Sequence, residues 1–278
     1  MKKFPILHLV LFVLTFVTTL AAGALQRGVD ILQYPSGIIA GLPFAATLMT
    51  ILLVHELSHY LAARKHHTVA TLPYFIPAPT FLGTFGAFIK MKSPIATRRA
   101  LIDIGASGPL AGFAVSVIAC IIGLGMSSVV SASGSEGALT LGDSLLFSLL
   151  SKVVLGIPPD NYDVLLHPVA FAGWIGLFIT SLNLLPIGQL DGGHIAFALL
   201  GERHRKVSIA LLVILAVMGI FFWEGWAFWA GLMLILGINH PPVLYWEQPL
   251  DSHRRTIGLV SLMVFVITFV PSPFKLNF

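Results

Sequence analysis

The sequence predicts an all-α polytopic membrane protein with six or seven transmembrane helices and a small membrane-associated β-strand or hairpin. Of its 278 residues, 56% are apolar and only 10% are charged, and the mean hydropathy is +0.91. A soluble globular domain carries about 25% charged residues. Residues 1–278 are therefore expected to form a single integral membrane domain whose first partner is the lipid bilayer.

Apolar runs give the expected helices, because about 20 apolar residues are needed to cross a bilayer. The runs cover residues 5–25, 38–63, 101–126, 169–187, 207–223, 226–238 and 257–270. The sixth run is short and follows the fifth after a tight Trp-rich turn, so the count is six or seven. A cleaved export signal is the alternative for the first run, but its length favours a retained helix.

The charge pattern predicts an orientation. The net charge of +4 comes from short basic clusters beside the apolar runs, which is typical of topology signals and lipid contacts and argues against a nucleic-acid partner. Seven crossings place these clusters on one side, expected to be cytoplasmic, and we expect the cell membrane. The basic residues are Lys2, Lys3, Arg64, Lys65, Lys90, Lys92, Arg98, Arg99, Arg203, Arg205, Lys206, Arg254 and Arg255. The connection 128–168 carries Glu136, Asp143, Asp160 and Asp163 and falls on the other side.

The second run contains an H-E-x-x-H pattern formed by His55, Glu56 and His59. Residues four apart lie on one face of a helix, so the two imidazoles can chelate one zinc ion with Glu56 beside them. Ionisable side chains are costly in lipid and usually mark a functional site. The alternative is a pair of core histidines that hydrogen-bond to neighbouring helices. The chemistry and the lipid setting together favour a metal.

A catalytic zinc normally takes three protein ligands, and the best third candidate is Asp191. It lies in the segment 183–194, where Pro186 and three glycines predict a broken or re-entrant helix. The alternative for Asp191 is a helix N-cap. Asn183, at the start of this segment, either donates to a substrate carbonyl or developing oxyanion or makes a bond between helices.

Together these two segments resemble the site-2 protease family of intramembrane zinc metalloproteases. The matching residues are His55-Glu56-x-x-His59 and Asn183-x-x-Pro186-x-x-x-Leu190-Asp191-Gly192, with weaker matches at 83–88, 107–112 and 239–243. The resemblance implies that His55, His59 and Asp191 bind one zinc ion and that Glu56 is the general base and proton shuttle. It also implies cleavage of peptide bonds within or near transmembrane segments of membrane proteins, in regulated intramembrane proteolysis.

Two further segments carry expectations. Residues 72–92 combine prolines, glycines and β-formers, which favours a strand or hairpin beside the metal helix whose free edge binds an unwound substrate; a plain connector is the alternative. Residues 143–155 favour an amphipathic helix at the membrane interface. His194 is expected behind the ligands or at the cytoplasmic mouth of the site. The histidines near span ends are expected to be solvated: His66, His67, His167 and His240.

We expect residues 38–200 to form a catalytic core of three core spans and residues 201–278 to add C-terminal transmembrane helices. No insertion is long enough for a PDZ domain. The competing interpretation is a transporter or metal carrier that uses the same His, Glu and Asp cluster. The absence of an inverted repeat and of further intramembrane carboxylates argues against it. The sequence leaves the substrate and the oligomeric state open.

Overall fold

The computed structural model describes residues 5–131, 139–156 and 162–276, and most of these residues are helical. Lys2, Lys3, Glu136 and Asp160 lie outside them. The helices are α1 (Ile6–Gln26), η1 (Pro35–Gly41), α2 (Leu42–Lys65), α3 (Arg98–Gly125), α4 (Leu145–Leu155), α5 (Pro168–Asn183), α6 (Asp191–Leu200), η2 (Gly201–Arg203), α7 (His204–Phe221), α8 (Gly225–Leu236) and α9 (Ser252–Thr268). The strands are β1 (Tyr74–Pro77), β2 (Thr84–Phe88), β3 (Ser128–Ser131), β4 (Leu139–Leu141), β5 (Tyr162–Leu165) and β6 (Phe274–Leu276).

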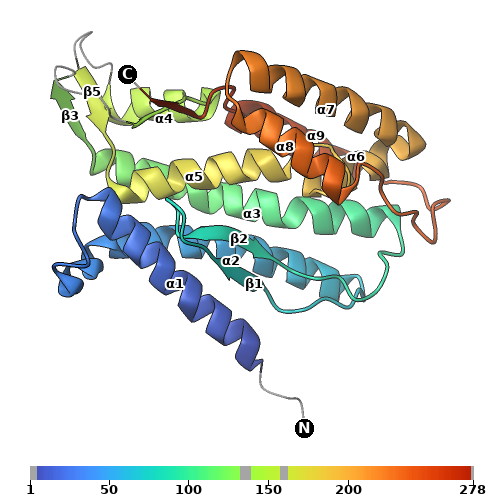
Figure 1. Cartoon of the computed structure of the whole chain (residues 1–278). Helices are drawn as coiled ribbons and strands as arrows, with labels where there is room; N and C mark the ends of the chain where they lie inside the picture. Colours follow the sequence, from blue (N-terminus) through green and yellow to red (C-terminus); the bar gives the residue numbers. More distant parts are fainter. Residues whose placement is uncertain (1–4, 132–138, 157–161, 277–278) are drawn as a thin grey trace.

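Helix α3 is the central element of the bundle. It packs against α2, α5 and α6, and Figure 1 shows α2, α3 and α5 running side by side. Glycines on α3 allow this close packing, since Gly108 and Gly112 face α2, and Gly123 faces the start of α5. Thr97 starts the helix by accepting a hydrogen bond from the backbone N–H of Ala100 at 3.1 Å, as an N-cap threonine does.

Every predicted apolar run forms a helix, but the count of crossings is not confirmed. Among the described residues, four stretches are long and apolar enough to span a membrane: Ile6–Gln26, Pro35–Lys65, Arg98–Gly125 and Asp191–Phe221. Helices α5 and α8 have only 16 and 12 residues. The last long stretch also turns at Gly201, whose φ of 62° lies in the left-handed region. These helices and stretches nevertheless make the chain a membrane protein by composition and length.

The predicted hairpin is present, and α1 holds it. Strands β1 and β2 pair antiparallel, with Tyr74 opposite Phe88 and Phe75 opposite Ala87. The Thr18 hydroxyl on α1 donates to the carbonyl oxygen of Gly83 at 2.6 Å. The all-α expectation missed two further antiparallel pairs, β3 with β5 and β4 with β6. These strands are only three or four residues long, too short for an alternating pattern to be recognised.

The expected helix at 143–155 is α4, which Ser144 caps by accepting from the backbone N–H of Phe147 at 3.1 Å. Phe147 packs into the core, while Leu145, Leu149 and Val153 are exposed. These three residues are spaced by four and share one face of the helix. An exposed apolar stripe on a short helix is what contact with lipid at an interface requires, so the expectation of an interfacial helix stays in place.

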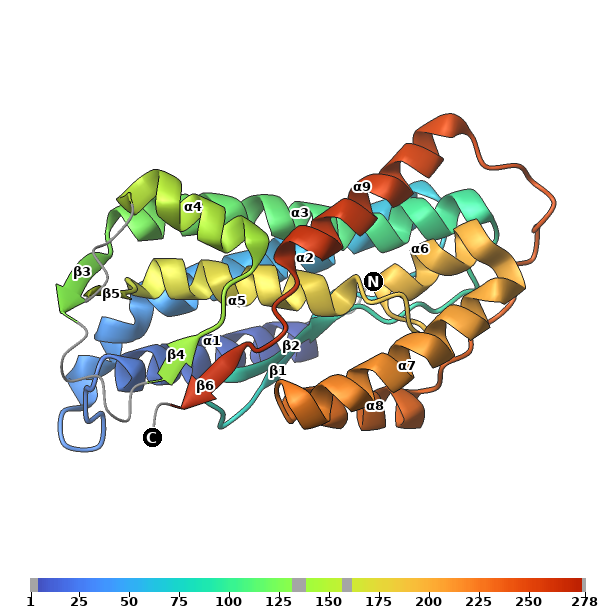
Figure 2. The same ribbon diagram turned by 90° about the horizontal axis from the view of Figure 1, so that it is seen from above.

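The helix ends that carry the basic clusters lie together at one end of the bundle (Figure 2). They are the C-terminal end of α2, the N-terminal ends of α3 and α9, and the junction of α6 with α7. Asp103 on α3 binds three of these elements together, because its carboxylate accepts from Arg254 at 2.6 and 3.0 Å and contacts His66 Nε2 at 2.7 Å. His66 is therefore a hydrogen-bond partner of Asp103, and the expectation that it is merely solvated is wrong.

Candidate metal centre

The H-E-x-x-H residues lie in the second half of α2 and are buried, with His55, Glu56 and His59 only 5–6% exposed. The spacing of four places both imidazoles on one face, and their Nε2 atoms are 3.1 Å apart. His59 lies six residues before the end of α2, about 9 Å along the helix at 1.5 Å per residue. The pair thus lies inside the membrane-spanning segment and near the basic end of the bundle.

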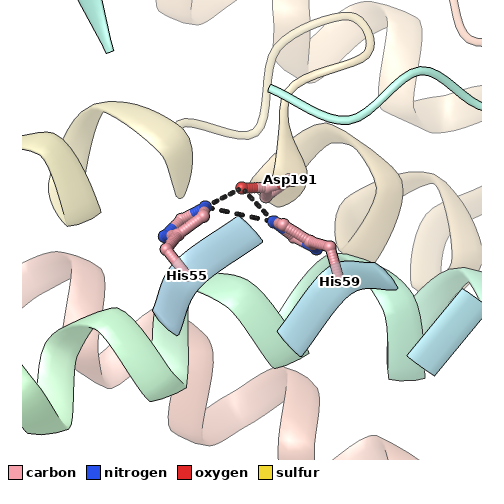
Figure 3. Close-up of side chains that lie close together, drawn as sticks. All are labelled: His55, His59 and Asp191. Atoms are coloured by element: carbon pink, nitrogen blue, oxygen red, sulfur yellow. Dashed lines mark hydrogen bonds and ion pairs between the residues drawn. The ribbon is translucent and has the colours of Figure 1, made fainter. Parts of the chain in front are cut away.

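Asp191 reaches the two histidines from a different part of the chain (Figure 3). Its Oδ2 atom lies 3.4 Å from His55 Nε2 and 3.3 Å from His59 Nε2. Helix α5 ends at Asn183, an irregular loop follows, and α6 begins at Asp191. Leu190 occupies the N-cap position and no side chain caps this helix. Asp191 therefore does not serve as the cap, and its carboxylate is free to face α2.

The atoms that converge here fit a zinc ion. His59 Nδ1–H donates to the carbonyl oxygen of Ile104 at 2.7 Å, which leaves a lone pair on Nε2. This lone pair faces the Asp191 carboxylate, so two acceptors lie 3.3 Å apart and require a cation or proton between them. Tetrahedral zinc with bonds of about 2.0–2.1 Å separates its ligand atoms by about 3.3 Å. The three separations of 3.1, 3.3 and 3.4 Å agree with that value.

Two glycines of α3 give the histidines their room. A Cβ atom at Gly108 would lie 2.1 Å from His59 Nε2, and one at Gly112 would lie 3.1 Å from His55 Nδ1. Both glycines belong to the segment 107–112 that the sequence analysis matched only weakly to the family. Their role here is steric: α3 approaches α2 so closely that a methyl group at position 108 would occupy the space of the His59 ring.

We expect Gly108→Ala to lower zinc affinity by at least about tenfold, since disturbing the surroundings of a metal ligand costs 10–100-fold. The added methyl group displaces the His59 ring from Asp191 and from Ile104. Competition with a chromophoric chelator measures the affinity. Gly231→Ala is the matched control, because a Cβ atom there meets nothing within 4 Å. Equal zinc affinity in Gly108→Ala and wild type would contradict the proposed geometry.

A cavity of about 230 Å³ opens beside the three candidate ligands. Its wall is formed by α2, by the end of β2 and the residues after it, and by the loop and first turn of α6. Glu56 lines it, and its carboxyl group faces the backbone N–H of Ile89. Asn183 also lines it, with Nδ2 3.3 Å from His55 Nε2. All five predicted site residues therefore surround one space.

The residues that support the Asp191 loop were not predicted from the sequence. Ser208 on α7 is fully buried; its hydroxyl donates to the carbonyl oxygen of Pro186 at 3.4 Å and accepts from the backbone N–H of Gly188 at 3.4 Å. His204, one turn earlier, lies 3.2 Å from the same hydroxyl. Irregular backbone at membrane depth needs such partners. No sequence signal marks Ser208, which stands alone at the start of an apolar run.

His240 also differs from expectation, through its contact with His194. His194 is one turn after Asp191 on α6 and lines the cavity. Its Nδ1 atom lies 2.6 Å from Nε2 of His240, which belongs to the connection between α8 and α9. The His240 ring stacks on Phe197 at 4.3 Å. His240 is therefore a packed residue next to the site, and the expectation that it is simply solvated is wrong.

Comparison with known proteins identifies the family of the chain. Residues 43–223 match Peptidase family M50. The chain is 34% identical over 249 residues, 86% of its length, to "Probable zinc metalloprotease EGY1, chloroplastic" of Arabidopsis thaliana. It is 32% identical over 250 residues, 84% of its length, to the EGY2 protein of the same plant. It spans only 44% and 42% of these relatives. Their chloroplast location gives the expected cell membrane no support. The matched region contains both segments that supply the candidate ligands, and the chain belongs to peptidase family M50.

Proposed function

We propose that this chain is a zinc metalloprotease that hydrolyses peptide bonds within or near the transmembrane segments of membrane proteins. The observation that carries the proposal is the convergence of His55, His59 and Asp191 inside a membrane-spanning bundle. Two neutral imidazoles and one carboxylate are the ligand set of many zinc peptidases, and they leave a position for water. Membership of a peptidase family favours this function over a transporter or metal carrier.

Glu56 and Asn183, which line the cavity, have chemical roles in this proposal. Bound zinc supplies Lewis-acid polarisation and lowers the pKa of water to about 7. Glu56 takes a proton from the attacking water and returns it to the leaving amide nitrogen, so one carboxylate serves both steps. Asn183 donates its amide N–H to the substrate carbonyl oxygen. Its contact with His55 places it beside the ligands, where a scissile carbonyl has to lie.

The hairpin supplies a place for the substrate backbone. A helix in lipid hides its carbonyl groups in internal hydrogen bonds, so a substrate has to unwind before it can be cut. Phe88 and Ile89, at the end of β2, line the same cavity as Asp191. In the described part of the chain β2 pairs only with β1, which leaves its second edge for an extended segment. Addition of a substrate strand at this edge would hold the peptide bond next to Glu56.

The membrane arrangement remains part of the proposal. Residues 38–200 form the catalytic core, with η1 and α2, α3, and the broken α5–α6 segment as its three core spans, and residues 201–278 add further helices. Six or seven crossings follow if the short helices also span a thinned bilayer. The basic end of the bundle faces the cytoplasm by the positive-inside rule, which places the cavity toward that side. One zinc ion is bound per chain.

Cleavage of a synthetic membrane-spanning peptide tests the function. The probe has about 20 leucine and alanine residues with a central Gly-Gly pair, and its control has Leu-Leu at that position. Glycine weakens the helix, so we expect faster, chelator-sensitive cleavage of the Gly-Gly probe, mapped by mass spectrometry to the apolar segment. Cleavage confined to the polar ends, or equal cleavage after zinc removal, would contradict the proposal.

A further inference from the structure

A chain of hydrogen bonds runs from the α8–α9 connection to the wall of the cavity. His240 Nδ1 lies 2.6 Å from the carbonyl oxygen of Pro241, and His240 Nε2 lies 2.6 Å from His194 Nδ1. His194 and His240 are both half-buried, and their rings meet edge to face at 4.8 Å. Since His194 forms part of the cavity wall, the chain joins a distant loop to the site.

Elementary hydrogen-bond chemistry fixes the protons along this chain. A carbonyl oxygen only accepts, so His240 Nδ1 must carry the proton that binds Pro241. Burial lowers the pKa of His240 to about 4, so at neutral pH its other nitrogen, Nε2, bears a lone pair. His194 Nδ1 must then donate to that lone pair. His194, when neutral, is held as the Nδ1–H tautomer with an unprotonated Nε2.

The unprotonated Nε2 atom of His194 is available to accept a hydrogen bond from a group in the cavity. Within the described residues no group hydrogen-bonds to it, and the half-buried ring borders the cavity. It lies outside the cluster of candidate ligand atoms of His55, His59 and Asp191, which are within 4.8 Å of one another. An accessible acceptor on the cavity wall can bind a donor that enters the cavity, so this nitrogen suits an N–H group brought by a ligand.

We propose that His194 binds the substrate backbone by accepting a hydrogen bond from a peptide N–H at Nε2, and that His240 is a positioning residue that fixes its tautomer. This inference rests on the proposed protease function. An extended peptide presents N–H and C=O groups along both edges. The end of β2 and His194 line the same cavity, so a peptide that pairs with β2 there enters the space that His194 borders and can turn its other edge to it.

The tautomer is tested first, without substrate or zinc, so that its outcome does not depend on the protease proposal. Full-length protein labelled with ¹³C,¹⁵N-histidine is studied by NMR in lipid nanodiscs at neutral pH, and His194→Gln assigns the signal. We expect His194 as the Nδ1–H form in wild type and loss of that fixed form in His240→Phe. An Nε2–H form in wild type, or no change in His240→Phe, would overturn the proposal.

Cleavage of the Gly-Gly probe tests substrate binding. We expect His194→Phe to raise KM about tenfold with kcat little changed, the loss of one hydrogen bond made equally to substrate and transition state. His194→Gln keeps an acceptor, so its KM should lie close to the wild-type value. His240→Phe should give a smaller loss of the same kind, and the double variant should match His194→Phe alone, since both act through one contact. If the increases in KM of the two single variants added in the double variant, His240 would act independently of His194, which would contradict its proposed positioning role.

A backbone-modified probe identifies the bond itself. Replacing one peptide N–H at a time by an ester oxygen removes the donor and leaves the side chains in place. At one position we expect the ester to raise the wild-type KM about tenfold and to leave the KM of His194→Phe unchanged. His253→Phe is the matched control, an exposed histidine at the same end of the bundle that should behave as wild type. If each ester changed the KM of wild type and of His194→Phe by the same factor at every position, the contact would be excluded.

Discussion

Glu56→Gln is expected to abolish peptide cleavage while zinc stays bound. Glutamine has nearly the same size as glutamate but cannot accept and return a proton at neutral pH. General acid–base groups contribute about 10²–10⁴-fold to rate, so kcat for the Gly-Gly probe should fall at least 100-fold. Zinc should remain, because Glu56 lies outside the group of atoms that converges at His55, His59 and Asp191.

The control for this variant is Glu202→Gln. Glu202 is an exposed carboxylate in η2, at the same end of the bundle but outside the cavity wall. Glu202→Gln should keep the wild-type kcat and zinc content. This result would show that the effect of Glu56→Gln comes from the position of its carboxylate in the site and not from the loss of a negative charge. Chelator-sensitive cleavage at the wild-type rate by purified Glu56→Gln would show that another group transfers the proton.

Asp191→Ala is expected to lose both zinc and activity. The substitution removes the negatively charged ligand and leaves two neutral imidazoles, 3.1 Å apart, as the protein's whole donor set. Substituting a residue that only hydrogen-bonds to a metal ligand already lowers metal affinity 10–100-fold, so removing a ligand itself should lower zinc affinity more than about 100-fold. The measurement is the free zinc concentration that half-activates metal-stripped protein in the cleavage assay.

Asp163→Ala is the matched control for Asp191→Ala. Asp163 is an exposed carboxylate on β5, so its loss changes the net charge equally without touching the cavity. Its zinc activation curve should coincide with that of wild type. Activation of Asp191→Ala at the wild-type zinc concentration would mean that the third ligand lies elsewhere and that Asp191 only supports the start of α6.

The parts of the structure that depend on local sequence were predictable. Apolar runs gave the helices, and the spacing of His55 and His59 gave their shared face, because a helix repeats every 3.6 residues. Asp191, 132 residues from His59, was the best third ligand on chemical grounds with an N-cap as the alternative, and the resemblance of two separate motifs favoured the pairing. The structure supports that pairing because it brings the Asp191 carboxylate within 3.4 Å of both imidazoles, a contact between two distant segments.

Contacts between distant segments could not be predicted. His194 meets His240 across 46 residues, and Asp103 meets Arg254 across 151. Each of these side chains is common near a span end, so its type alone does not reveal a partner. The number of crossings stays unconfirmed for a related reason: α5 stops at Asn183 and the chain resumes as α6, and a break of this kind divides one apolar region between two short helices.

Zinc bound per chain, measured by elemental analysis of wild type beside Asp191→Ala at equal free zinc, tests the central claim most directly. A site built from His55, His59 and Asp191 predicts one zinc per wild-type chain and less than about a tenth of that in the variant, since a catalytic zinc needs three protein ligands. Equal zinc in the two proteins, or none in wild type, would contradict it.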